Sequence, residues 1–264
     1  MAEEQQSGQE RMHPSFINTI RQKERVKEKL SGIKHKIGIY SAKGGVGKTT
    51  VAVNIAYALK DKGFKVGLLD ADIDCPNVTI FLGIGEKMVP QYPLRPIVKD
   101  GIKIASTAMV IDEIKKPIIW RGALITKMLG DFFENTDWGE LDYLIIDLPP
   151  GTSDAPLTVM QLLDMEGFVI VTTPQKVAAI NSIRSGLMAK RLGMAILGVV
   201  ENMSSGKESA NTQEVAKELN AEVLGTVKSS DVLREAADAG SAPLHLDRKI
   251  EEEFLEIAKK LAGR

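Results

Sequence analysis

The sequence predicts an α/β fold, a mostly parallel twisted sheet with helices on both faces. From residue 35 onward, short apolar runs rich in β-branched residues alternate with helical patterns, as strands joined by helical crossovers do. The runs are also apolar along nearly their whole length, which is typical of strands covered on both faces. The predicted strands are 37–40, 66–69, 102–105, 143–146, 168–172 and 196–200.

The domain organisation follows from where this alternation begins. Residues 1–34 form a polar extension, in which the first 15 or so are expected to be disordered and 17–30 to form a highly charged helix with a solvated face. Residues 35–264 are expected to form a single domain, since that length is sufficient for one large α/β core.

Composition excludes several functional classes. The chain has 264 residues, 44% hydrophobic and 26% charged, and its formal net charge of −1 gives no general attraction to nucleic acid or to an anionic membrane. No segment approaches the ~18 apolar residues of a membrane span, and the first residues have neither the basic nor the apolar part of a secretion signal. A single cysteine fits a reducing cytosol. We expect a cytoplasmic protein.

A glycine-rich loop between the first strand and a helical stretch predicts nucleotide binding. Its glycines let backbone N–H groups point at phosphate oxygens, and the helix that follows adds its positive end. The terminal lysine would reach the β and γ phosphates, and the next hydroxyl would hold Mg²⁺. Ala42 replaces the first glycine of the usual pattern. Alanine tolerates most backbone conformations with negative φ, so this replacement is compatible with the loop. The predicted ATP-binding residues here are Ala42, Lys43, Gly44, Gly45, Val46, Gly47, Lys48, Thr49 and Thr50.

Three aspartates follow apolar strands and are expected to lie in the same crevice. Asp147 has the Walker B arrangement, in which a carboxylate organises Mg²⁺ or its bound water. Asp70 is predicted to support the metal's water shell, and Asp72 to orient the attacking water. Thr49, Asp70 and Asp147 are therefore the predicted Mg²⁺ residues. For Asp70 and Asp147, a helix cap is the alternative role.

Lys43, the first lysine of the loop, indicates which class of nucleotide-binding protein this is. Residues 43–49, Lys-Gly-Gly-Val-Gly-Lys-Thr, resemble the phosphate loop of the MinD, nitrogenase-iron-protein and Mrp class of P-loop ATPases. The resemblance implies a homodimer in which Lys43 crosses to the partner's nucleotide and neutralises charge on the transferred phosphoryl group. Lys43 and Asp72 are accordingly the predicted catalytic residues. A solvated surface lysine is the alternative for Lys43.

Further segments are similar to those of the Mrp family. They are Ile-Trp-Arg-Gly at 119–122, Asp-Leu-Pro-Pro-Gly-Thr at 147–152, Val-Thr-Thr-Pro-Gln at 171–175 and Glu-Asn-Met at 201–203. The resemblance implies a cytosolic ATPase that dimerises, carries a [4Fe–4S] cluster and passes it to apoproteins, with apoprotein or scaffold partners. It also implies that Asn202 contacts the adenine ring. A structural asparagine in a turn is the alternative role for Asn202. The chain departs from the family at Val227 and Lys228, where relatives commonly have Ile-Pro in a loop near the base. This departure leaves the choice between adenine and guanine nucleotides undecided.

The resemblance fails where a cluster would be bound. Cluster-carrying members have a Cys-x-x-Cys pair soon after the Glu-Asn-Met-Ser segment, and this chain has only Cys75. A [4Fe–4S] cluster usually takes four thiolates, so Cys75 would ligate iron only with outside help. A small, partly buried cysteine is the expected alternative. The missing pair favours a second function, an ATP-gated dimeric switch that binds a protein partner without a cluster. A ligase or kinase would need an acceptor pocket that no motif indicates.

The C-terminal stretch separates this prediction from a membrane-positioning ATPase. Ile250, Phe254, Ile257 and Leu261 form a stripe at helical spacing, but four glutamates lie between them. Anionic lipid would repel those glutamates. We therefore expect the stripe to pack on the domain.

Overall fold

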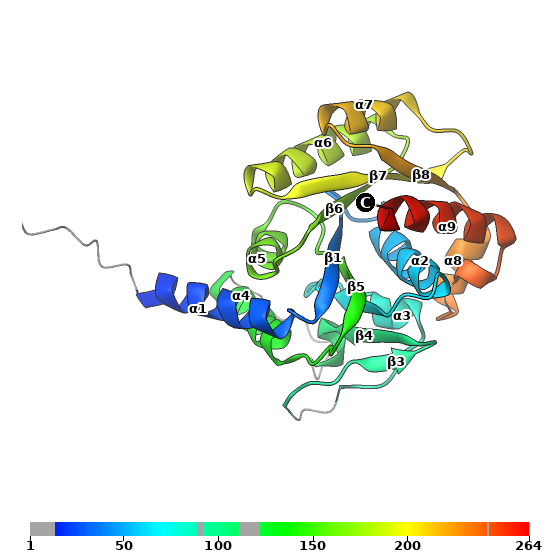
Figure 1. Ribbon diagram of the computed structural model, residues 1–264. Helices are drawn as coiled ribbons and strands as arrows, with labels where there is room; N and C mark the ends of the chain where they lie inside the picture. The colour runs from blue at the N-terminus through cyan, green and yellow to red at the C-terminus, as the bar shows by residue number, and fades with distance from the viewer. Residues whose placement is uncertain (1–13, 89–91, 111–121, 242, 264) are drawn as a thin grey trace, which may run out of the picture.

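The computed structural model describes residues 14–88, 92–110, 122–241 and 243–263, and over these residues the chain forms one eight-stranded sheet in the order β3-β4-β2-β5-β1-β6-β7-β8 (Figure 1). Every neighbouring pair is parallel except β3 and β4. The mostly parallel sheet predicted from the sequence is confirmed. The strands are β1 Ile33–Tyr40, β2 Val66–Asp70, β3 Ile97–Lys99, β4 Ile102–Ser106, β5 Leu141–Asp147, β6 Gly167–Thr172, β7 Ala195–Ser204 and β8 Val223–Lys228.

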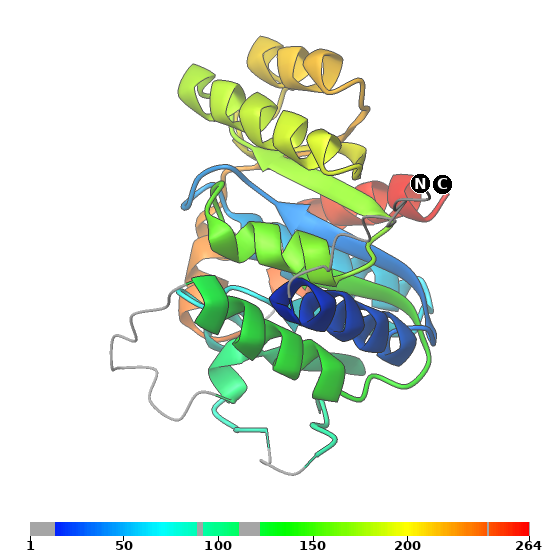
Figure 2. The same ribbon diagram turned by 90° about the vertical axis from the view of Figure 1, so that its left-hand side faces the viewer.

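Helices cover both faces of the sheet, also as predicted. One face carries α2 and α9, and the other carries α5, α6 and α7, with α1 and α4 packed together beside α5 (Figures 1 and 2). The helices are α1 Pro14–Lys29, α2 Lys48–Asp61, α3 Val78–Phe81, α4 Gly122–Asn135, α5 Asp154–Leu162, α6 Lys176–Arg191, α7 Ala210–Glu218, α8 Asp231–Asp238 and α9 Arg248–Ala262, with short 3-10 turns η1 Thr107–Met109 and η2 Pro243–His245.

Both ends of the described chain pack on this core. Helix α1 lies along α4 (Figure 2), where Val26 is fully buried and Arg25 pairs with Glu134 at 2.6 Å. The predicted charged helix is present, and it begins at Pro14. The expectation of disorder over the first 15 or so residues falls mainly on residues 1–13, which lie outside the described part of the chain.

The C-terminal helix α9 packs its apolar stripe on the domain, as predicted. Ile250, Phe254, Ile257 and Leu261 are all buried, against α2 and β8. In the described stretches, none of the helices has both the length and the apolar content that crossing a membrane requires.

The sequence missed two of the strands. β3 has only three residues, is half-buried and pairs antiparallel at the sheet edge. β8 contains a glycine, a threonine and a lysine and is buried only at Leu224 and Val227, so it has none of the continuous apolar character by which the other strands were recognised.

Candidate nucleotide site

The phosphate loop runs from the end of β1 into the start of α2. Gly45 and Gly47 both have φ of 82°, in the left-handed region that favours glycine. Gly47 is the N-cap of α2, and the Val51 amide donates to its carbonyl at 3.0 Å. Ala42 is not in the left-handed region, so the alanine that replaces the first glycine introduces no strain. The predicted strand, loop and helix are all present.

Three predicted site residues meet at the base of this loop. The Lys48 Nζ lies 2.5 Å from Oδ1 of Asp147, and the Thr49 hydroxyl donates to Oδ2 of the same carboxylate at 2.7 Å. Asp147 ends β5, and its side chain and that of Lys48 are almost fully buried. The structure thus places a cation, a hydroxyl and a carboxylate together at the point where the loop ends and α2 begins.

The segment after Asp147 is bonded to the start of the loop. The Tyr40 hydroxyl donates to the Gly151 carbonyl at 2.5 Å, and the Gly151 amide donates to the Ser41 carbonyl at 3.1 Å. The Leu148 amide also donates to the Ile39 carbonyl at 3.1 Å. Residues 148–151 therefore lie beside the start of the phosphate loop and are hydrogen-bonded to it.

Asp70 lies next to Asp147 on the neighbouring strand. The two residues are direct partners in the β2–β5 register. The Asp70 carboxylate is fully buried and accepts hydrogen bonds from the Val78 amide and the Ser106 hydroxyl, each at 3.0 Å. Val78 is the first residue of α3, so Asp70 holds the start of that short helix while it lies beside the Walker B carboxylate.

Asp72 is also buried, in the turn after β2. Its carboxylate accepts from the Cys75 amide at 3.0 Å, and its carbonyl accepts from the Thr107 hydroxyl at 2.8 Å. Sequence reasoning missed Ser106 and Thr107, the partners that fix Asp70 and Asp72. Their signal was two polar residues directly after the predicted apolar strand 102–105, at the same end of the sheet as the aspartates.

The site carries more negative than positive charge. Burial, and then the nearby Asp147 carboxylate, raise the pKa of Asp70 well above its ordinary value. Burial is also the main cause that raises the pKa of Asp72 to about 6, although Lys48 opposes the shift. A divalent cation beside Asp147 and Thr49 would offset this excess charge. A hydroxyl and one or two carboxylates are also the protein ligands that Mg²⁺ uses beside phosphates, so the donor set fits the predicted metal.

The remaining predicted residues are Asn202, which lies near the end of β7 beside the phosphate loop, and Lys43, which lies in the loop itself. The Asn202 side-chain amide donates to the Val46 carbonyl at 2.9 Å, and its Nδ2 occupies the space that a Cβ at Gly47 would need. Lys43 is exposed, and its carbonyl accepts from the Ser41 hydroxyl at 3.0 Å. Asn202 therefore braces the loop, while the Lys43 side chain is open to solvent.

Cys75 corrects one expectation. The sequence favoured a partly buried cysteine, but Cys75 is exposed on the turn between β2 and α3. Its neighbours Asp74 and Asn77 are exposed polar residues, so this part of the turn faces solvent. Across the described residues, no three His, Cys, Asp or Glu side chains are grouped so as to hold a metal ion. The fold thus supplies one thiol near Asp72 and no preformed cluster site.

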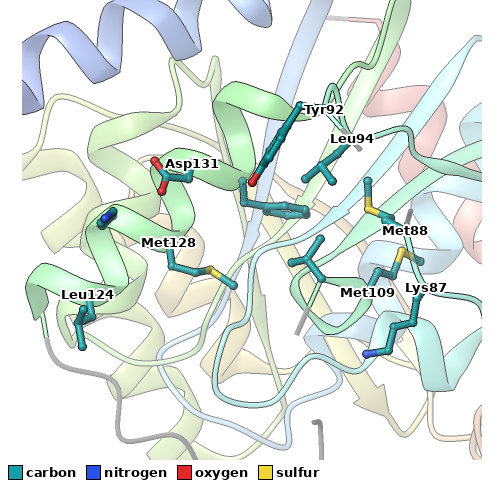
Figure 3. A pocket seen from close by; sticks show the side chains of 11 residues that line it. Lys87, Met88, Tyr92, Leu94, Met109, Leu124, Met128 and Asp131 are labelled. Carbon is teal, nitrogen blue, oxygen red and sulfur yellow. The ribbon is translucent and has the colours of Figure 1, made fainter. Parts of the chain in front are cut away.

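A separate cavity of about 480 Å³ lies between α4 and residues 87, 88, 92, 94, 109 and 110 (Figure 3). Its lining is mostly apolar and includes Met88, Met109 and Met128. None of the residues of the phosphate loop lines it. The nucleotide site does not depend on this cavity.

The segment at 119–121, predicted from the sequence to match the Mrp family, lies outside the described residues.

Comparison with known proteins identifies the family. The model of the ParA family, described as NUBPL iron-transfer P-loop NTPase, matches residues 32–262. The iron–sulfur cluster carrier protein of Methanocaldococcus jannaschii is 43% identical over 91% of this chain and 88% of its own length. That of Synechocystis is 41% identical over 90% of this chain and 73% of its own length.

Solved structures agree with the fold. A nucleotide-binding protein from Archaeoglobus fulgidus, in complex with ADP, superimposes with a TM-score of 0.74 and 34% identity, over 88% of this chain and 96% of that one. The septum site-determining protein MinD of Pyrococcus horikoshii, complexed with Mg-ADP, has a TM-score of 0.69 at 20% identity, over 86% and 96% of the two chains, and shows the fold alone. With its phosphate loop, Walker B aspartate and matching sequence, this chain belongs to the NUBPL iron-transfer family of P-loop NTPases.

Proposed function

We propose that this protein binds and hydrolyses ATP with Mg²⁺ and uses that cycle in iron–sulfur cluster assembly or in the transfer of clusters to apoproteins. The observation that carries the proposal is the convergence of Lys48, Thr49 and Asp147 at the end of a glycine loop. Iron–sulfur cluster carrier proteins are among the relatives, at identities of 36–43%, which supports the biological role.

Each residue has a defined part in the proposed reaction. Backbone amides of 43–50 hold the phosphates, Lys48 neutralises their charge, and Thr49 and Asp147 hold Mg²⁺ with support from Asp70. The metal supplies charge stabilisation on the β and γ phosphate oxygens. Asp72 orients the attacking water. Asn202 contacts the adenine edge, for which its amide has both a donor and an acceptor.

The proposed active species is a homodimer in the cytoplasm, with residues 35–264 as the ATPase domain and 1–34 as its extension. Lys43 is exposed in the single chain, as a group that acts on a partner's nucleotide must be. A cation supplied across an interface accelerates phosphoryl transfer by about 10³ to 10⁵. Hydrolysis is then coupled to assembly, and an apoprotein or scaffold that favours one assembly state regulates it. Neither nucleic acid nor a membrane is a proposed partner.

The cluster is cargo, and the residues present do not supply a full ligand set for it. A homodimer of this chain offers two thiolates, both from Cys75, whereas a [4Fe–4S] cluster usually takes four. Further thiols would come from the recipient or a scaffold. The single cysteine also favours the second candidate, an ATP-gated switch that binds a partner and carries no cluster.

Anaerobic reconstitution with iron and sulfide separates the two candidates. Iron and acid-labile sulfide are counted after desalting, for the parent protein and for Cys75→Ala, with and without an added low-molecular-weight thiol. A cluster of about four irons per dimer that is lost in Cys75→Ala supports a carrier. Failure to retain iron under any condition points to the switch.

A further inference from the structure

Glu201 is a buried carboxylate that the proposed nucleotide chemistry does not use. It lies near the carboxyl end of β7 with no exposed surface, directly beside Thr172 of β6 and Thr226 of β8 in the sheet register. Burying a charge is costly unless hydrogen bonds compensate it. Glu201 therefore needs an explanation from its contacts.

One oxygen of Glu201 is bonded to the start of α7. Its Oε2 accepts from the Ser209 amide at 3.0 Å, from the Ser209 hydroxyl at 2.5 Å and from the Thr212 hydroxyl at 2.5 Å. Ser209 is itself the N-cap of α7 and accepts from the Thr212 amide. Hydrogen bonds to a charged acceptor are about twice as strong as neutral ones, so Glu201 fixes the beginning of α7 on the sheet.

The next residue makes a contact on the other side of the strand. Side chains of successive strand residues point to opposite faces, and the Asn202 amide donates to the Val46 carbonyl of the phosphate loop. Met203 then has φ of 57°, a left-handed conformation that a non-glycine residue keeps only where its surroundings fix it. Two anchors on opposite faces of β7 thus hold this turn.

The loop between these anchors is tied at both ends. The Ser204 hydroxyl donates to the Lys207 carbonyl at 3.0 Å and accepts from the Gly206 amide at 3.1 Å. Ser209, at the far end, is bonded to Glu201. The Lys207 side chain is exposed. Residues 203–209 therefore comprise the last two residues of β7 and the loop that leads to α7, and Glu201 joins the two ends of this segment.

The other oxygen of Glu201, Oε1, does not take part in capping α7. Oε1 is buried without a hydrogen-bond partner among the described residues, and so is the Thr172 hydroxyl, although Thr172 and Glu201 are register partners. A neutral side chain would cap α7 without leaving a charged oxygen in this position. The buried carboxylate costs free energy of folding, which its three hydrogen bonds to Ser209 and Thr212 offset.

We propose that Glu201 is a positioning residue that holds Asn202 against the phosphate loop and thereby links nucleotide binding to the conformation of residues 203–209. The inference rests on the proposed nucleotide site. Phosphates that bind the loop amides restrain Val46, and Val46 restrains Asn202 through its carbonyl. Because Glu201 and Asn202 are adjacent on one rigid strand, the restraint reaches Ser209 and the loop that Ser209 closes.

Limited trypsin digestion of the full chain, with and without ADP, tests this link, since Lys207 is exposed. Cleavage after Lys207 is followed by mass spectrometry, and ADP affinity by calorimetry. ADP is expected to slow this cleavage in the parent protein. In Glu201→Ala the protection is lost and the Kd for ADP rises about fivefold. Glu201→Gln keeps an acceptor for Ser209 but removes the charge, and it is expected to restore part of the protection.

Thr212→Val keeps the test valid if Glu201→Ala does not fold, because it removes one bond to Glu201 without changing β7. It is expected to reduce the protection partially. Thr158→Val is the matched control, since Thr158 is a buried threonine on α5, away from β7, and this variant should behave as the parent. If ADP binds the parent but protects Lys207 equally in Glu201→Ala or Thr212→Val, the proposal is wrong. If the parent binds no ADP, the nucleotide proposal itself has failed.

Discussion

The phosphate loop and the turn that carries Cys75 lie at the same edge of the sheet, but they differ in how completely the chain equips them. Around the phosphate loop, Lys48 and Thr49 are both bonded to Asp147, and the segment after Asp147 is bonded to the strand before the loop. The turn after β2 exposes one thiol. The chain therefore has the residues for a nucleotide cycle but only part of a cluster site, and the two activities should be separable by mutation.

The largest expected effect concerns catalysis across a dimer. Lys43→Ala should lower kcat for ATP by about 10³, because the charge supplied to the phosphoryl group is lost, while ADP affinity changes little. Phosphate release measures the rate. Mixing Lys43→Ala with Asp72→Ala should restore part of the activity, since one composite site regains both groups. Absence of rescue would exclude a shared site and restrict the nucleotide cycle to the single chain.

A smaller effect is expected at the metal. Thr49→Ala should raise the Mg²⁺ concentration needed for half-maximal hydrolysis about tenfold, because the hydroxyl that we propose as a metal ligand, and that donates to Asp147, is removed. Thr49→Ser keeps the hydroxyl and is the matched variant. A Mg²⁺ titration of ATPase activity distinguishes them. Equal curves for the two variants would show that the hydroxyl does not contribute to metal binding.

The smallest effect concerns the thiol. Cys75 is exposed, but partial desolvation of its thiol, and then the carboxylates of Asp72 and Asp74, raise its pKa above the ordinary value, so less of it is thiolate at neutral pH. Alkylation by iodoacetamide should therefore be slow at pH 7 and should accelerate through and beyond the ordinary titration range of cysteine. Asp74→Asn removes one of the raising charges and should accelerate the reaction at pH 7. A rate unchanged by Asp74→Asn would mean that this carboxylate does not control the thiol.

Much of the fold could be predicted because the buried strands have a simple pattern. Strands covered by helices on both faces are apolar along their length, as β2 and β6 are, with every residue buried. The edge strand β3 lacks this pattern because its side chains are only partly covered, and Val98 is exposed. A lysine at the end of β8 is likewise compatible with its exposed position there. Periodicity therefore predicts the centre of the sheet better than its edges.

The candidate site could be predicted where one short motif contains the chemistry. Residues 42–50 are contiguous, so their grouping needs no knowledge of the fold. The partners of Asp70 and Asp72 come from β4 and η1, and their proximity depends on β4 lying beside β2. Glu201 was missed as a functional candidate because its partners Ser209 and Thr212 become visible only when α7 is placed on the sheet.

Calorimetric titration of the parent protein and of Lys48→Ala with MgATP tests the central claim most directly. The parent should bind one nucleotide per chain, and Lys48→Ala should bind at least about 100-fold more weakly, because the buried cation that we propose contacts phosphate is lost. Lys60→Ala is the control, since Lys60 lies on the same helix and pairs with Asp61 at the surface. Equal affinity for the parent and Lys48→Ala, with both proteins folded, would contradict the assignment of the phosphate loop and the account built on it.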